Sequence, residues 1–268
     1  MSLQLKSVRP AQGARWLRDG FRLFGRSPLA FSLMFVSFLA LALVSSIVPL
    51  AGPVLLFGAL PLVSLGFMVA AESALSGGRV HPGQFIAPLK GDAVRRRGLL
   101  VLCGLHAVAL LAVMAASDAV DGGAFDALVA AGSTAKDPKE VETLLADPRL
   151  TQGLMLRFGG MALVSIPFWH APALVHWGGQ GAAQALFSST LALWRNKGAY
   201  IVYLAAWMGM IALFGVVTAL LGSLLGMRSA VGQLSLPAGL IFSTVFYVSL
   251  IFTFHDCFGG SEAVVSPP

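Results

Sequence analysis

Apolar residues run along the chain in six stretches, each close to the ~20 residues that a helix needs to cross a bilayer. The stretches cover residues 28–48, 53–76, 98–117, 154–177, 198–226 and 235–255. Segments rich in polar residues, glycine or proline separate them. The pattern predicts an all-α integral membrane protein, a six-transmembrane-helix bundle that can be divided into three helical hairpins with interfacial amphipathic helices.

The segment before the first apolar stretch, residues 12–27, has the pattern of an amphipathic helix. At 100° per residue, four arginines form one narrow stripe and the large apolar side chains lie opposite. The arginines are Arg15, Arg18, Arg22 and Arg26, and the apolar residues are Trp16, Leu17, Phe21, Leu23 and Phe24. Because Pro28 breaks the helix, we predict a separate interfacial helix with its aromatic side chains toward the acyl chains. The alternative is a plain extension of the first span.

The overall composition excludes a soluble globular protein. Hydrophobic residues make up 57% of the chain and charged residues 11%, against roughly 25% charged in a soluble domain. The mean hydropathy is +0.81. We expect an interfacial helix in residues 1–27, a membrane domain in residues 28–257 with an external loop at 118–153, and a tail at 258–268.

The basic residues predict the orientation of the chain, because short loops rich in lysine and arginine stay in the cytoplasm. Six precede the first span, five lie between the second and third, and two between the fourth and fifth. They are Lys6, Arg9, Arg15, Arg18, Arg22 and Arg26; Arg79, Lys90, Arg95, Arg96 and Arg97; and Arg195 and Lys197. Both termini are therefore predicted to be cytoplasmic. The net charge of +6 then marks contact with anionic lipid headgroups and not with nucleic acid.

Motifs for catalysis are missing from the sequence. It contains no HExxH, no GxSxG and no P-loop, so we expect no enzymatic activity and no cofactor. Cys103 and Cys257 have no CxxC spacing, which makes a metal site unexpected. Both map to the cytoplasmic half, where thiols stay reduced.

Two histidines lie deep in predicted spans and form a candidate intramembrane polar site. His106 is about 12 Å from the start of its span and His170 about 10 Å from the end of the next, at 1.5 Å per residue. Consecutive helices are usually neighbours, so we predict that both rings face one interior space, linked directly or through water. The alternative is that each ring bonds separately to a backbone carbonyl or to a serine or threonine hydroxyl.

Small residues form a seam along the fifth span, at Ala212, Gly215, Ala219, Gly222 and Gly226. Such a seam lets another helix approach closely. It predicts either internal packing or a contact between subunits, and it leaves open a homo-oligomer or an unidentified membrane partner.

The stretch FWHAPALVHWGG, residues 168–179, places a proline and two glycines at the end of the fourth span. Pro172 removes one backbone hydrogen bond, so we expect the helix to bend there and the chain to enter a second amphipathic segment at residues 181–196. The whole stretch, HAPALVHWGGQGAAQALFSSTLALWRNKGAY, resembles a family of Gram-negative bacterial inner-membrane proteins with six helices and unknown function. VRPAQGARWLRDGFRLFGRSPLAF and PLVSLGFMVAAESALSGGRVHPGQF carry the same resemblance, which implies a bacterial inner membrane and no particular activity.

Three functions fit these features. The preferred one is a non-catalytic scaffold or envelope-maintenance protein that contacts anionic lipid. The alternative is a small transporter or permease subunit, for which a polar cavity open to the cytoplasm is expected between the third, fourth and sixth spans. A membrane-embedded enzyme is the third, and the missing motifs argue against it.

Overall fold

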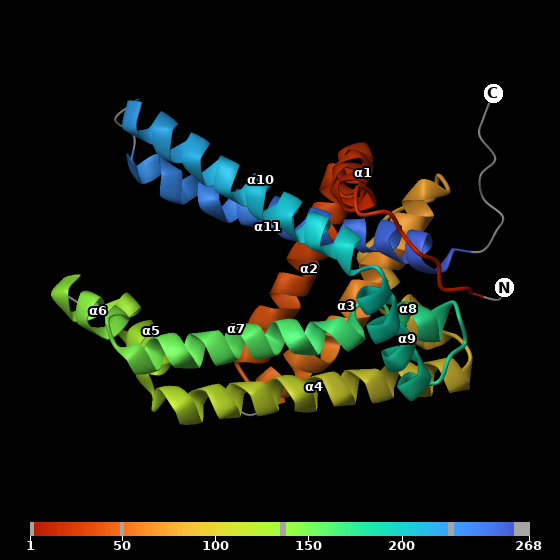
Figure 1. The fold of residues 1–268 in the computed structure, drawn as a ribbon, viewed down its shortest axis with the longest axis horizontal. Helices are drawn as coiled ribbons and strands as arrows, with labels where there is room; N and C mark the ends of the chain where they lie inside the picture. Colours follow the sequence, from red (N-terminus) through yellow and green to blue (C-terminus); the bar gives the residue numbers. More distant parts are fainter. Residues whose placement is uncertain (1–2, 49–50, 135–137, 225–227, 260–268) are drawn as a thin grey trace.

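The computed structural model describes residues 3–48, 51–134, 138–224 and 228–259, and these fold almost entirely into helices. Three pairs of long helices form hairpins (Figure 1). They are α2 (Pro28–Ser46) with α3 (Ala51–Leu75), α4 (Ala93–Asp121) with α7 (Pro148–Phe168), and α10 (Lys197–Leu224) with α11 (Arg228–Phe258). All six are apolar and long enough to cross a membrane, α7 together with the short helix α8 (Ala171–His176). The predicted six-span all-α fold is confirmed.

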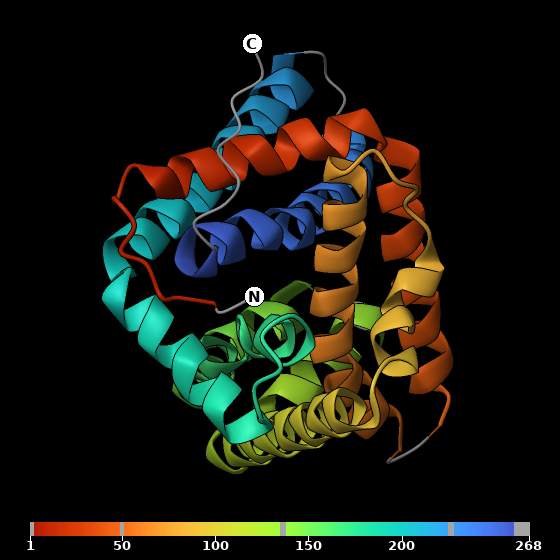
Figure 2. The ribbon, with the colours of Figure 1, turned by 90° about the vertical axis from the view of Figure 1, so that its right-hand side faces the viewer.

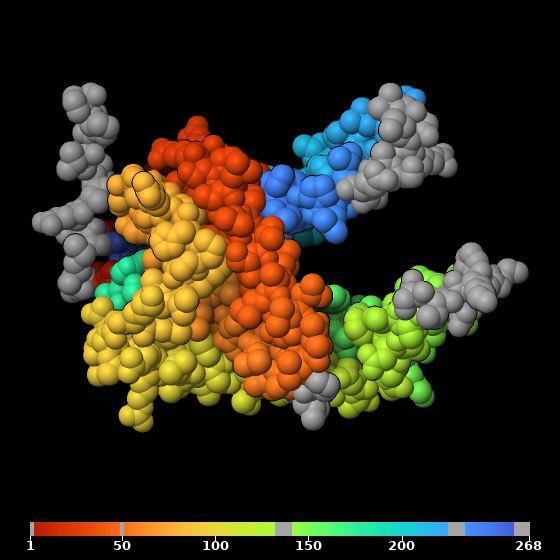
Figure 3. Space-filling model, turned by 180° about the vertical axis from the view of Figure 1, so that it is seen from behind, coloured from red at the N-terminus to blue at the C-terminus, as the bar shows by residue number. Residues whose placement is uncertain are grey.

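The hairpins are not bundled side by side along their whole length. The α4/α7 and α10/α11 hairpins extend toward the same side of the molecule as two separate arms (Figure 1), whereas α2 and α3 run steeply across them (Figure 2). Figure 3 shows an open wedge between the arms. Helices α5 (Ala124–Thr134) and α6 (Pro138–Leu145) lie at the outer end of the α4/α7 arm. Helix α6 lies within residues 118–153, the predicted external loop.

Shorter helices gather at the opposite end of the molecule. They are η1 (Pro82–Phe85), η2 (Ala87–Lys90), α8 and α9 (Ala182–Arg195). Helix α9 is the second predicted amphipathic segment. The backbone N–H of Lys6 donates to the carbonyl of Cys257 at 2.8 Å, so the N-terminal segment and the end of α11 lie side by side.

Helix α1 (Gln12–Arg26) lies across α10 and α11 and is seen end-on in Figure 1 and lengthwise in Figure 2. Its apolar face corrects one prediction. Trp16, Leu17 and Leu23 are buried in the protein core and do not face acyl chains. The amphipathic pattern does not distinguish the two outcomes, because a protein groove and a lipid tail are equally apolar partners.

Close backbone approach holds α1 in this position. A Cβ at Gly13 would overlap the carbonyl oxygen of Ala199 on α10, and one at Gly20 would lie 2.7 Å from the Cβ of Ser249 on α11. The indole Nε1 of Trp16 also donates to Asp256 Oδ2 at 2.6 Å. Helix α1 is therefore an integral part of the helical body.

The outer end of the α4/α7 arm is joined by a buried charged cluster. Arg157 on α7 donates to Ser117 Oγ at 3.2 Å and to Asp118, and its Nη2 lies 3.7 Å from Asp121 Oδ2. Ser117 donates in turn to the carbonyl of Gly153 at 2.8 Å. These bonds tie α4 to α7 where Arg157 and Asp121 are both screened from solvent.

The small-residue seam of α10 is mostly unpacked in the single chain. Ala212, Gly215 and Ala219 are exposed, and a Cβ at Gly215 would meet no atom of the described residues within 4 Å. Gly222 is buried, and Gly226 lies outside the described residues. The prediction that the seam packs internally is therefore wrong for Ala212, Gly215 and Ala219 in this single chain.

Candidate functional site

The candidate site is built where a proline interrupts the backbone hydrogen bonds of α3. Pro61 has no N–H, so the carbonyl of Phe57, four residues earlier, lacks its helical partner. His106 of α4 fills this position, with its Nδ1 2.7 Å from that carbonyl oxygen. Since a carbonyl can only accept, Nδ1 carries the proton, and the Nε2 of the neutral ring is left as an acceptor.

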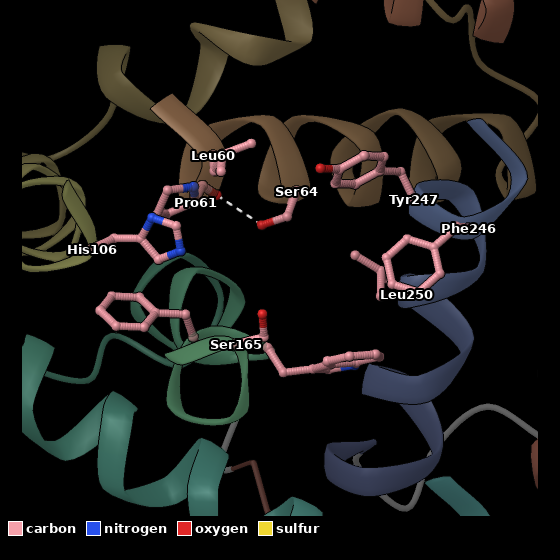
Figure 4. Close-up of a pocket in the computed structure, with 10 residues that line it drawn as sticks. Leu60, Pro61, Ser64, His106, Ser165, Phe246, Tyr247 and Leu250 are labelled. Carbon is pink, nitrogen blue, oxygen red and sulfur yellow. Dashed lines mark hydrogen bonds between the residues drawn. The ribbon is translucent and has the colours of Figure 1, made fainter. Parts of the chain in front are cut away.

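A pocket of about 150 Å³ lies beside this histidine, between α3, α4, α7 and α11. Figure 4 shows the ring of His106 facing this space, with Ser64 and Ser165 on either side of it. The pocket is lined by Leu60, Pro61, Ser64, His106, Ser165, Phe168, Trp169, Phe246, Tyr247 and Leu250. It therefore lies between the three helices where a cavity was expected, with α3 forming a further wall.

The polar atoms of the pocket are mostly acceptors. Ser64 donates its hydroxyl hydrogen to the carbonyl of Pro61 at 2.9 Å, and Ser165 donates to the carbonyl of Met161 at 2.8 Å. The oxygen lone pairs of both serines therefore remain available. Tyr247 has no hydrogen bond to any residue that the structure describes, so its hydroxyl is free to donate. In Figure 4 the hydroxyl of Tyr247 lies on the edge of its ring that is nearer to Ser64.

Aromatic side chains make up much of the pocket wall. The ring of Phe168 packs edge-on to His106 with centroids 4.7 Å apart, and Trp169 packs edge-on to Phe246 at 5.7 Å. The ring of Tyr247 stacks on Phe67 at 5.1 Å, which fixes its orientation.

His170 occupies a different environment. It is fully buried at the break between α7 and α8, where its backbone N–H donates to Ser189 Oγ at 3.0 Å. Ser189 donates to the carbonyl of Ile166 at 3.2 Å, so one hydroxyl replaces the helical bond between residues 166 and 170. The imidazole Nε2 lies 2.6 Å from the hydroxyl of Tyr200. The span is thus interrupted at Trp169 and His170, just before Pro172, and Ser189 completes the hydrogen bonding there.

The predicted direct link between the two histidines is wrong for this structure. His106 bonds to a backbone carbonyl and lines the pocket, whereas His170 bonds to a tyrosine hydroxyl and does not line it. The helical rise predicts a similar depth for the two residues, but depth alone does not determine which way a ring points. Each ring has its own partner, as in the alternative, but the partner of the His170 ring is a tyrosine hydroxyl and not a backbone carbonyl or a serine or threonine hydroxyl.

A buried polar network continues from His170 to the N-terminal segment. Tyr200 contacts Cys257 Sγ at 3.6 Å, and the side-chain amide of Asn196 donates to the same sulfur at 3.4 Å. Asn196 also accepts from the N–H of Val8 at 2.8 Å and donates to the carbonyl of Lys6 at 3.1 Å. Cys257 and Asn196 therefore serve as anchors for residues 6–8.

His255 and Glu72 form a further pair of ionisable residues. His255 Nε2 lies 3.0 Å from Glu72 Oε2, and the neighbouring Asp256 accepts from Trp16. Within the described ranges, no three histidine, cysteine or acidic side chains gather in a group that could hold a metal ion.

The arginine stripe of α1 points away from the protein. Arg15, Arg18, Arg22 and Arg26 are all exposed, as the helical spacing predicts. Asp19 lies 3.2 Å from Arg18 and 3.6 Å from Arg22, so one acid partly offsets the four positive charges.

Comparison with known proteins gives one informative relative. The chain is 32% identical, over 263 residues, to a protein of Burkholderia thailandensis described as a probable inner membrane protein. The match covers 97% of this chain and 96% of the relative. No family model matches the chain, and no solved structure matches it.

Proposed function

This chain belongs to the family of the Burkholderia probable inner membrane protein, and we propose that it is a non-catalytic scaffold that binds anionic lipid through α1. It is a multi-pass inner membrane protein with six apolar helices long enough to span the bilayer. The observation that carries the proposal is the division of α1 into two faces. One face is buried against α10 and α11, and the other presents four exposed arginines.

The fixed position of α1 supports a lipid-binding role. Because Trp16 is fully buried and bonded to Asp256, the helix cannot rotate without breaking the core. The arginines are therefore held on one surface before any lipid arrives, which lowers the ordering cost of binding. Arginine also matches phosphate geometry, since its planar fork can donate two parallel hydrogen bonds.

The proposed orientation places this surface in the cytoplasmic leaflet, with both termini in the cytoplasm and residues 118–153 outside. The basic segments before the first span, between the second and third and between the fourth and fifth favour it, because short loops rich in lysine and arginine remain inside. The close contact between Lys6 and Cys257 supports placing both ends of the chain on one side.

The bonding of the polar groups supports a non-catalytic role. His170, Ser189, Tyr200 and Asn196 all bond to protein groups that would otherwise be unpaired in the core. Hydrogen-bonded networks of this kind make a fold rigid and specific. One ring nitrogen in this network, Nδ1 of His170, is buried without a hydrogen-bond partner among the described residues.

The experiment that tests the proposal replaces Arg15, Arg18, Arg22 and Arg26 together by glutamine. Each arginine near an anionic surface contributes up to about 1 kcal/mol, so we expect at least a tenfold loss of affinity for vesicles containing phosphatidylglycerol. The matched control replaces the same four residues by lysine and should retain most of the binding. Equal binding by the glutamine variant and the unmodified chain would refute the lipid-contact role.

A transporter or permease subunit is the second candidate, and the pocket beside His106 favours it. At about 150 Å³, however, this pocket is smaller than the roughly 300–1,000 Å³ of typical small-molecule sites. A conducting path would need α3 or α7 to move. Substrate uptake by vesicles containing only this chain would favour the transporter over the scaffold.

A further inference from the structure

We infer that the pocket beside His106 binds the ring of a membrane-soluble hydroquinone, whose hydrocarbon tail lies in the wedge between the two arms. This site is separate from the arginine surface of α1 and does not depend on it. The inference rests on the location of the pocket, its size and the hydrogen-bonding character of its walls.

The pocket lies at the root of the wedge. Helices α7 and α11 belong to different arms, and they meet where Trp169 Nε1 lies 3.4 Å from Thr253 Oγ1. Trp169 and its neighbour Phe168 line the pocket from α7, and Phe246 and Leu250 line it from α11. Beyond this contact the arms separate, and Figure 3 shows the space between them open. A ligand with an apolar tail could therefore enter from the hydrocarbon of the bilayer without crossing a polar surface.

The size of the pocket fits one six-membered ring. A protein cavity of about 150 Å³ holds a benzene molecule, and this pocket has about that volume. The aromatic walls suit a flat ring, because edge-to-face and stacked contacts both stabilise aromatic pairs. A phospholipid headgroup is charged and would lose its hydration here, so it does not fit this location.

The polar atoms select hydroxyl groups on that ring. The Nε2 of His106 and the oxygens of Ser64 and Ser165 all accept, because their own hydrogens are absent or already used. A ligand hydroxyl can donate to any of them. The hydroxyl of Tyr247 has no partner among the described residues and can donate to a ligand oxygen. A hydroquinone meets both requirements, whereas a quinone cannot donate to the three acceptors.

The test uses decyl hydroquinone, kept reduced, as the probe for the purified full-length chain in detergent micelles. Binding is measured by isothermal titration calorimetry of the protein in micelles, with protein-free micelles as the partition blank. We expect saturable binding, at least tenfold weaker binding of the dimethyl ether, which has lost both donors, and weaker binding of the quinone. Tyr247→Phe should weaken hydroquinone binding about fivefold, as the loss of one hydrogen bond implies.

A matched pair of substitutions locates the site. Leu60→Trp fills the pocket and should abolish saturable binding, whereas Leu100→Trp on the exposed surface of α4 should leave it unchanged. If Leu60→Trp does not fold, the ether and Tyr247→Phe still decide the matter. The inference is overturned if the ether binds as well as the hydroquinone, if neither saturates, or if both tryptophan variants bind equally. His106 is not substituted, because its loss would also leave the carbonyl of Phe57 unpaired.

Discussion

Ser189 offers the sharpest test of how this fold tolerates a broken membrane helix. Its hydroxyl accepts from the N–H of His170 and donates to the carbonyl of Ile166, across the gap between α7 and α8. The Ser189→Ala substitution removes this bridge, so the N–H of His170 and the carbonyl of Ile166 both lose their hydrogen bond to the hydroxyl. The side chain is fully buried, so water has no direct access to replace the hydroxyl.

The size of the effect follows from the two lost bonds. An unsatisfied buried donor or acceptor costs about 1–3 kcal/mol, which sets an upper range of about 2–6 kcal/mol. The carbonyl of Ile166 keeps a long contact to the N–H of Trp169 at 3.5 Å, so part of the penalty is relieved. We therefore expect a loss of about 2–4 kcal/mol in the free energy of unfolding. Helix propensity works in the opposite direction, because alanine is the better helix former.

Two measurements check this prediction. Unfolding by SDS in mixed micelles gives the stability change, and amide hydrogen exchange gives the local opening at His170. An opening made easier by about 2–4 kcal/mol speeds exchange at that amide roughly 30- to 1000-fold. The control is Thr190→Ala, on the exposed neighbouring residue, whose hydroxyl donates only to the carbonyl of Leu186 in its own helix. Equal effects of the two substitutions would refute the bridging role of Ser189.

Three further predictions address other parts of the molecule. Arg157→Met leaves the buried carboxylate of Asp121 without its counter-charge and should lower the free energy of unfolding in SDS by about 3–5 kcal/mol. An unchanged midpoint of SDS unfolding would contradict the stabilising role of this cluster. Gly13→Leu should displace α1 and speed trypsin cleavage of the N-terminal segment relative to the unmodified chain, and equal cleavage rates would contradict the close packing at Gly13. With the native cysteines replaced, a cysteine at Ser133 should react with an impermeant thiol reagent in intact cells and one at Ser261 should not; the reverse labelling would overturn the proposed orientation.

The spans could be predicted from the sequence because they depend on one-dimensional quantities. The length of an apolar run and its freedom from charge fix where a helix can cross a bilayer. The predicted run at residues 53–76 and the observed helix Ala51–Leu75 differ by only two residues at the start and one at the end. The same quantities contain no information on how the hairpins cross.

The arrangement of the arms could not be predicted, because lipid-facing and protein-facing surfaces are both apolar. Leu213 and Val216 on α10 are exposed, whereas Val245 and Val248 on α11 are buried, although all four are aliphatic. The partner of the seam on α10 could not be predicted for the same reason. Small residues permit close packing but do not specify a partner, and a Cβ at Gly215 would contact none of the described residues.

The pocket was only partly predictable. A cavity between the third, fourth and sixth spans was expected only for a transporter, and Tyr247 and Ser64 do not differ in pattern from other residues of membrane helices. Pro61 is the residue from which a polar contact at this place could have been predicted. A proline inside a span leaves the carbonyl four residues earlier unpaired, so a donor from a neighbouring helix can be expected near Phe57.

The repair of α3 and the chemistry of the pocket are consequences of a single hydrogen bond. Because Phe57 requires a donor, Nδ1 of His106 must hold the proton, and Nε2 therefore has to accept. If Pro61 were alanine, the carbonyl of Phe57 would regain its helical partner and the imidazole would be free to adopt either tautomer. Pro61→Ala should thus stabilise α3 while weakening the binding of decyl hydroquinone. Weaker binding in a more stable protein is the result that a purely structural role for His106 would not produce, and unchanged binding would separate the pocket from the bond that is proposed to set its polarity.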